Sequence, residues 1–209
     1  MTSFVPKKVA LTAVLCALAL LAGCVEGGGG SAPANVRVGD DIVVAGPSGY
    51  CVDTSASRTG ESGAFVLLGS CASLGHSLMA ARPKYPAILT ASISGGGPDP
   101  ETFRASFPGM AKFLNSTAGR AALSRSGKAA SVQIVQIGSA GEVMTIRATD
   151  TAAAPGQNVE PEYWRALLTM KGQIVTLTVL GLKDKPLSAD VKRSLLDAFI
   201  ARVRAVNAG

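Results

Sequence analysis

Two adjacent segments near the C-terminal end of the chain constrain the fold most. Residues 163–170 and 173–180 are rich in β-branched, aromatic and leucine residues, and only Lys171-Gly172 separates them. Two such segments joined by a two-residue, glycine-containing turn predict a β-hairpin. Along residues 174–179 strongly and less strongly apolar side chains alternate, which predicts that one face of this strand is packed and the other less so.

The other strand-like segments are short and do not alternate regularly with helices. They are residues 42–45, 50–52, 64–68, 87–93, 131–137 and 142–149. The last two flank a glycine-containing turn and predict a second hairpin, whereas residues 54–63 and 152–161 are polar and predict loops. The continuous apolar run at 64–68 predicts a buried strand. This order of elements predicts an α+β fold with an antiparallel sheet.

A helical region is predicted in the middle of the chain. It opens at Asp99 or Pro100, and Phe103 and Phe107 are expected to face the core at helical spacing. Pro108-Gly109 should break or kink it, because proline lacks the N–H that an interior helical position needs. A second helical piece over residues 110–123 is expected to turn Phe113 and Leu114 inward.

The chain ends in a predicted amphipathic helix that covers the sheet. Ser188 is a suitable N-cap residue, because its hydroxyl can accept from a free N–H of the first turn. Apolar residues then recur mostly at spacings of three and four: Val191, Leu195, Leu196, Phe199, Ile200, Val203 and Val206. The basic residues expected to face solvent are Lys192, Arg193, Arg202 and Arg204.

The first 23 residues form a leader with three zones. Lys7 and Lys8 precede an apolar run from Val9 to Leu21, and Ala22-Gly23 follows it. This arrangement is typical of an export signal. The apolar run is shorter than the ~20 residues that a membrane-spanning helix needs, which disfavours an ordinary transmembrane anchor.

The sequence Leu21-Ala22-Gly23-Cys24 resembles the lipobox of bacterial lipoproteins. The resemblance implies that the Cys24 thiol is acylated, that the leader is cut between Gly23 and Cys24, and that the mature protein is held on a membrane by its lipid. Two or more acyl chains anchor a protein durably, whereas one holds it only marginally. An ordinary secretory signal and an uncleaved anchor are the alternatives.

The leader defines the domain organisation and the expected location. We predict a signal peptide over 1–23, a lipidated, glycine-rich flexible tether over 24–35, and a single α+β domain over 36–209. The protein is expected in the cell envelope, facing the periplasm. By the same resemblance, Val25 after the lipidated cysteine favours the outer over the inner membrane.

Two of the four cysteines remain after the leader and the lipid site are assigned. Cys16 leaves with the leader and Cys24 carries lipid, so Cys51 and Cys71 are left in an oxidising compartment. A disulfide between them is predicted, with two free thiols as the alternative. A zinc site is disfavoured, because His76 is the only histidine and no C-x-x-C spacing occurs. No metal site is predicted.

No motif predicts catalysis or a cofactor. Gly-x-Ser-x-Gly is absent, His76 and Ser77 are adjacent, and Gly127-Lys128 is followed by alanine where a phosphate loop needs serine or threonine. We therefore predict no catalytic residue. Glu160 with Glu162 is expected at an element end for solubility. Tyr163 with Trp164 is expected to serve packing, with a binding platform as the alternative.

The basic residues do not predict a nucleic-acid partner. The net charge is +6, but Lys7 and Lys8 lie in the leader, and aromatic residues make up only 5%. Outside the last helix, the densest basic cluster is Arg120, Arg125 and Lys128.

Three functional hypotheses remain. The first is a non-enzymatic envelope protein that meets the membrane through lipid on Cys24 and binds another envelope component or supports assembly. The second is an exported hydrolase, which needs His76 in contact with a serine or carboxylate. The third is a carrier of a small apolar ligand, which predicts an apolar cavity beneath the sheet. The order of elements over residues 36–206 is similar to the PsbP-like fold of small exported and lipid-anchored proteins, a resemblance that transfers no functional residue.

Overall fold

The computed structural model describes residues 31–39, 41–60, 63–152 and 158–208. The predicted leader, the cleavage site at Gly23, the lipid site at Cys24, Val25 and most of the tether lie outside these residues. Within the described part of the chain, no helix combines the length and the apolar character needed to span a membrane.

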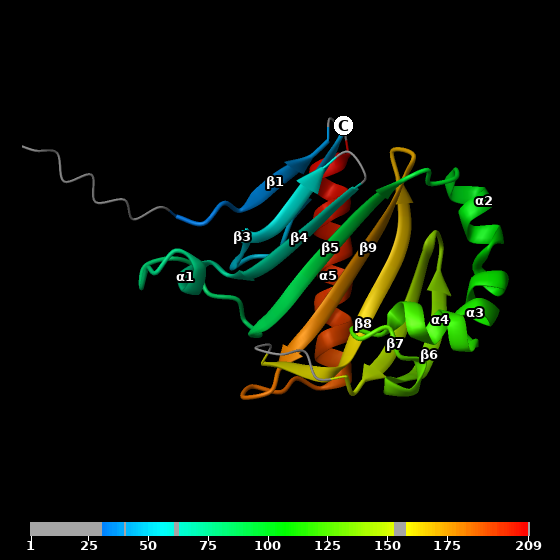
Figure 1. The fold of residues 1–209 in the computed structure, drawn as a ribbon. Helices are drawn as coiled ribbons and strands as arrows, with labels where there is room; N and C mark the ends of the chain where they lie inside the picture. Colours follow the sequence, from blue (N-terminus) through cyan, green and yellow to red (C-terminus); the bar gives the residue numbers. More distant parts are fainter. Residues whose placement is uncertain (1–30, 40, 61–62, 153–157, 209) are drawn as a thin grey trace, which may run out of the picture.

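The body of the protein is a seven-stranded antiparallel sheet with helices on both faces, which confirms the predicted α+β class (Figure 1). The order across the sheet is β3-β4-β5-β9-β8-β7-β6. Both predicted hairpins are formed, as β6–β7 and β8–β9. The strands are β3 (Tyr50–Gly60), β4 (Gly63–Ser70), β5 (Ala87–Gly95), β6 (Val132–Ala140), β7 (Val143–Asp150), β8 (Val159–Met170) and β9 (Gln173–Leu182).

The chain fills the sheet from both edges toward the centre. It runs inward from β3 to β5, crosses to the far edge through the central helices, and returns through β6, β7 and β8. Strand β9 closes the gap by pairing with β5 on one side and β8 on the other. Segments far apart in sequence therefore meet in the middle of the sheet.

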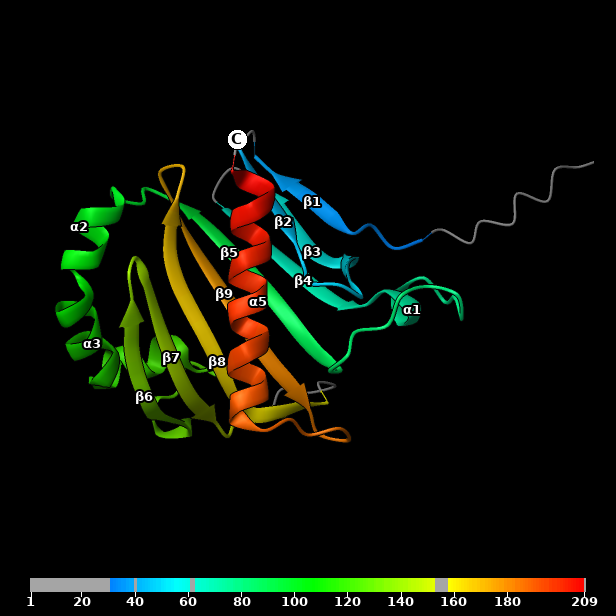
Figure 2. The same cartoon turned by 180° about the vertical axis from the view of Figure 1, so that it is seen from behind.

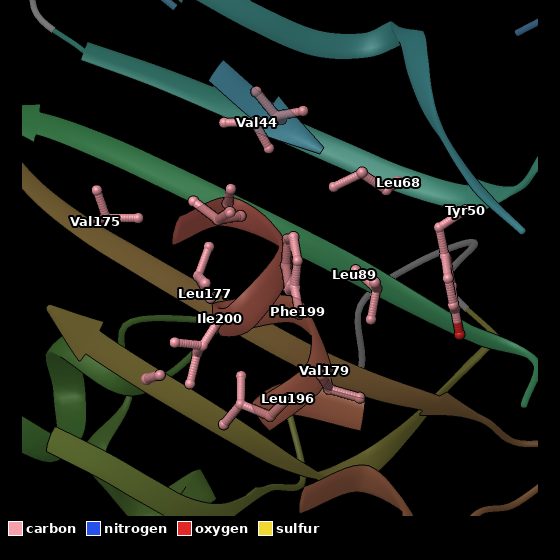
Figure 3. Close-up of a cluster of buried hydrophobic side chains, with 14 of the residues drawn as sticks. Val44, Tyr50, Leu68, Leu89, Val175, Leu177, Val179, Leu196, Phe199 and Ile200 are labelled. Carbon is pink, nitrogen blue, oxygen red and sulfur yellow. The ribbon is translucent and has the colours of Figure 1, made fainter. Parts of the chain in front are cut away.

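Helix α5 (Ala189–Asn207) covers one face, as predicted (Figure 2). The Ser188 hydroxyl accepts from the Val191 N–H at 3.3 Å. Leu196, Phe199 and Ile200 pack on the central strands, and Phe199 has no exposed surface (Figure 3). The sheet residues facing them include Leu68, Leu89, Leu177 and Val179.

The prediction that Lys192 faces solvent is wrong. Its side chain is only 1% exposed and forms ion pairs with Glu160 at 3.3 Å and Glu162 at 3.0 Å. Position 192 lies three residues before Leu195 and four before Leu196, so helical geometry places it on the buried face. The register of β8 shifts between Val159 and Tyr163, and both carboxylates come from this irregular stretch. Their charges compensate the buried ammonium, and so they do more than aid solubility.

A small second sheet lies beside α5 on the same face (Figure 2). It pairs β1 (Asn35–Val38) with β2 (Ile42–Ala45). The side-chain amide of Asn207 donates to the Val43 carbonyl at 2.7 Å, and its oxygen accepts from the Val43 N–H at 2.9 Å. The Pro33 carbonyl also accepts from the Val52 N–H. Ordered pairing therefore begins a little before the predicted boundary at residue 36.

Three short helices lie over one part of the opposite face (Figure 1). They are α2 (Pro100–Ala105), α3 (Phe107–Asn115) and α4 (Thr117–Leu123). Asp99 caps α2, and the rings of Phe103 and Phe107 meet edge to face at 5.2 Å. With Leu114 and Leu123 they pack on β6, β7 and β8.

Two details of the helical region differ from prediction. The break falls at Ser106, and Pro108 lies in the first turn of α3, where the missing N–H is tolerated. The second piece is divided again at Ser116, whose hydroxyl caps α4. Adjacent residues of a helix point ~100° apart, and in α3 Leu114 is buried whereas Phe113, predicted to face inward, is 51% exposed.

The polar segments contain more strand than predicted. Strand β3 extends through most of residues 54–63, and β8 begins at Val159, inside the predicted loop 152–161. β3 is an edge strand, so its outer residues need no apolar pattern. The short helix α1 (Cys71–Leu74) was not predicted.

The predicted disulfide is confirmed. Cys51 in β3 and Cys71 at the start of α1 are bonded, with their Cα atoms 4.8 Å apart. The bond joins the edge strand to the end of its neighbour, β4.

Candidate functional site

The face of the sheet opposite α5 is only partly covered. Helices α2, α3 and α4 pack over β6, β7 and β8, whereas no helix of the described residues lies in front of β4, β5 and β9 (Figure 1). Apart from the buried Thr178, many side chains of these three strands that point away from α5 are therefore only half-buried. They include Phe65, Leu67, Ile88, Thr90 and Leu180.

A pocket of about 500 Å³ occupies this uncovered area. Its floor is built from rows of residues that face each other across neighbouring strands. One row joins Leu67, Thr90, Thr178 and Arg165 by direct pairing of β4, β5, β9 and β8. A second row joins Ile88, Leu180 and Tyr163. The lining is mainly apolar with a few polar groups, which is the usual composition of a small-molecule site.

Arg165 is the charged group on the pocket floor. Its Nε donates to the Thr178 hydroxyl at 3.1 Å, and its guanidinium carbon lies 5.1 Å from the centre of the Tyr163 ring. Burial lowers the pKa of Arg165, and the neighbouring charge of Arg125 acts in the same direction, whereas Tyr163 and Asp150 act in the opposite direction. An arginine side chain nevertheless stays charged, so the pocket contains a half-buried cation. Among the described residues, no carboxylate forms an ion pair with it.

Arg125 lines the pocket beside the end of α4. Its backbone N–H donates to the Asp150 carboxylate at 2.7 Å, and its Nη2 donates to the Glu160 carbonyl at 3.2 Å. Burial raises the pKa of Asp150, but hydrogen bonds from the Arg125 and Ala152 N–H groups and the charge of Arg125 lower it, with a downward net shift. Asp150 is therefore an ionised carboxylate that holds the loop carrying Arg125.

Tyr163 connects the same loop to the sheet. Its hydroxyl donates to the Leu123 carbonyl at 3.4 Å, and its ring is buried between the pocket and the helices. Burial raises the pKa of Tyr163, so the hydroxyl remains a hydrogen-bond donor near neutral pH. Tyr163 therefore packs with the helical layer, as predicted, and it also lines the pocket. Trp164, its neighbour, is 5% exposed and packs on the α5 side.

Asp53 lies at the other end of the pocket, on β3. Its carboxylate accepts from the Ser55 hydroxyl and from the Ser55 and Ala56 N–H groups. The hydrogen bond from Ser55 lowers the pKa of Asp53. Asp53 pairs with Leu67, so four inter-strand steps, about 19 Å at ~4.8 Å per step, separate it from Arg165. It is too far away to neutralise that arginine.

The catalytic alternative finds no support in this geometry. His76 is exposed, and no hydrogen bond joins it to a serine or carboxylate within the described part of the chain. Its backbone has a positive φ of 47°, in the turn after α1. The same described residues contain no group of three or more metal-ligating side chains.

The predicted basic cluster is not a single surface. Arg120 donates to the Asn115 carbonyl and stays on the helical layer, whereas Arg125 lines the pocket. Lys128 is exposed and does not line it.

Two features of the sequence are related to the pocket, but the spacing of apolar residues did not predict it. Residues 64–68 are continuously apolar and predicted a strand buried on both faces, but only Val66 and Leu68 meet α5, while Phe65 and Leu67 face the pocket. Arg165 interrupts the apolar segment 163–168. A charged residue at that position indicates that one face of β8 is incompletely covered.

Comparisons of the chain with protein-family models, with curated proteins and with solved structures found no match.

Proposed function

We propose that this chain is a lipid-anchored protein of the bacterial cell envelope that binds a small amphipathic molecule on the uncovered face of its sheet. The observation that carries the binding role is the pocket of about 500 Å³, with apolar walls and a cation on its floor. The lipobox resemblance at Leu21–Cys24 supports the anchor. The Cys51–Cys71 disulfide is consistent with an oxidising compartment.

This proposal joins two of the functional hypotheses. A non-enzymatic binding domain explains the missing catalytic constellation, and a ligand carrier explains why apolar side chains are left half-exposed on a sheet. Exposed apolar surface is disfavoured in water, so its retention in a concave site favours a ligand or partner. The outer membrane, rather than the inner, remains the proposed location because of Val25, and the PsbP-like resemblance remains a proposal about the fold family.

The anchor is tested by fractionating cells that express the full chain. Cys24→Ser should remove the acyl mass and release the protein from membrane fractions. Cys16→Ser is the matched control, because it changes a cysteine inside the leader and should leave lipidation intact. If Cys24→Ser sediments with membranes as the unaltered protein does, the anchor is refuted.

The binding role is tested on the predicted mature chain, residues 24–209, made with Cys24→Ser so that no attached acyl chain competes. Decanoate and decanol are titrated separately and followed by calorimetry. Leu67→Glu should abolish binding, because it places a charge on the pocket floor. Phe113→Glu is the control, since Phe113 is exposed on α3 and does not line the pocket. Absence of binding by both compounds would refute the proposal.

A further inference from the structure

We infer that the ligand is a single-chain amphiphile with an acidic headgroup, a carboxylate or a phosphate, which Arg165 and Arg125 bind together. The inference rests on the proposed function, because it assigns the chemistry of the ligand in the same pocket. It also states at which end of the pocket the headgroup binds and which residues determine its charge.

The first step is the charge of the pocket. Both arginines line the pocket, and the charge of Arg125 lowers the pKa of Arg165, although Tyr163 and the carboxylate of Asp150 offset this in part. Two like charges repel each other, and removing water from them adds a further cost. In the described part of the chain neither arginine has a carboxylate at ion-pair distance. An acidic group placed between them would relieve both effects.

The second step is hydrogen-bonding capacity. A guanidinium has five N–H donors in a planar fork that matches the oxygens of a carboxylate or phosphate. Arg165 uses Nε toward Thr178, and the described residues accept no hydrogen bond from its two terminal nitrogens. Arg125 donates through Nη2 to a backbone carbonyl, which orients its side chain without neutralising it. Arg165 therefore has donors left for a headgroup.

The third step is the direction of the apolar part. From Arg165 on β8 the floor continues across β9 and β5 to β4, where Phe65 and Leu67 are half-buried. These three inter-strand steps span about 14 Å at ~4.8 Å each. Ile88 and Leu180 lie in the adjacent row. An extended acyl chain that starts at Arg165 would cross the strands over this apolar floor.

A cationic headgroup fits less well. Asp53 is the carboxylate of the pocket lining, and its oxygens already accept three hydrogen bonds from its own turn. It also lies at the end of the pocket remote from the two arginines. The charges of the site thus favour an anion at one end and do not favour a cation at the other.

The test compares three ten-carbon probes on the mature chain with Cys24→Ser. These are decanoate, decyl phosphate and decanol, each titrated by calorimetry. One charge-assisted interaction should make at least one acidic probe bind roughly tenfold tighter than decanol. The tighter of the two acidic probes identifies the headgroup class. Equal binding of all three would overturn this inference and leave the proposed function standing, whereas no binding by any probe would overturn both.

The variants assign the preference to the arginines. Arg165→Met keeps an extended side chain without charge, so the preference for the acidic probe should fall to about one while decanol binding is retained. Arg125→Met should reduce the preference roughly threefold, since its side chain is also held by a backbone carbonyl. The control is Arg202→Met, an exposed position on α5 at the other face of the sheet, which should bind like the parent chain. If Arg165→Met keeps the full preference for the acidic probe, the headgroup assignment is wrong. Should Arg165→Met fail to fold, the same criterion applies to Arg125→Met.

Discussion

The two faces of the seven-stranded sheet are made from the same strands but are covered to different extents. On one face, α5 and the β1–β2 sheet bury side chains such as Leu89 and Leu177 completely. On the other, α2, α3 and α4 stop at β8 and leave Phe65 and Leu67 half-buried. Covered apolar residues stabilise the fold, whereas uncovered ones in a concave area remain available to a ligand. The comparison separates residues needed for stability from residues needed for binding.

The largest expected effect comes from two phenylalanines on opposite faces. Phe199→Ala should lower the free energy of unfolding by about 4 kcal/mol, because it leaves a cavity where α5 packs on the sheet. Phe65→Ala should cost only about 1 kcal/mol, since the side chain is half-exposed and the space opens to solvent. Urea denaturation of both variants checks this, and equal losses would contradict the comparison.

The second largest loss of stability is expected on removal of the disulfide, because this bond holds the edge strand β3 to the end of β4. Replacing both cysteines, as Cys51→Ser with Cys71→Ser, should lower the free energy of unfolding by about 3 kcal/mol, as expected for a loop of this length. The measurement is again urea denaturation. The parent protein with its disulfide reduced should show the same decrease in the free energy of unfolding relative to the oxidised parent. A double variant as stable as the oxidised parent would show that β3 does not depend on the bond.

A smaller effect is expected from the buried ion-pair cluster on the α5 face. Lys192→Met should destabilise the protein by about 2 kcal/mol, because Glu160 and Glu162 lose their shared cation while Arg147 still pairs with Glu162. Arg204→Met, at an exposed position on the same helix, is the control and should change stability little. Thermal unfolding measures both. If Lys192→Met leaves the stability unchanged, the ion-pair cluster does not stabilise the packing of α5.

The smallest effect is the pH dependence of the loop that carries Arg125. The folded-state pKa of Asp150 is lowered, so its contribution to stability is present above the ordinary value of 3.8 and is lost as the pH falls through the folded pKa. Asp150→Asn should therefore lose less stability on acidification than the parent chain. Unfolding curves recorded above and below that pH measure the difference, and parallel losses in the two proteins would contradict it.

Much of the fold could be predicted from local patterns. The hairpin at Lys171-Gly172, the capped helix after Ser188 and the Cys51–Cys71 bond depend on turn chemistry, capping and compartment, which act over a few residues or on a small set of candidates. The extent of β3 could not be predicted in this way, because an edge strand does not need the alternating pattern that reveals a strand. Nor could the helix breaks at Ser106 and Ser116, because serine also occurs inside helices.

The sequence by itself determined the antiparallel α+β class and the apolar stripe of α5, and it is the basis of the proposed export and lipid anchor. Only the tertiary structure decided that Lys192 is buried between two carboxylates and that Arg165 lies on the floor of an apolar pocket beside Arg125. The physical reason is that periodicity reports which residues share a face, whereas burial depends on whether another element covers that face. In this protein three short helices cover this face of the sheet only as far as β8. The covered part is core, and the uncovered part beyond it is the pocket.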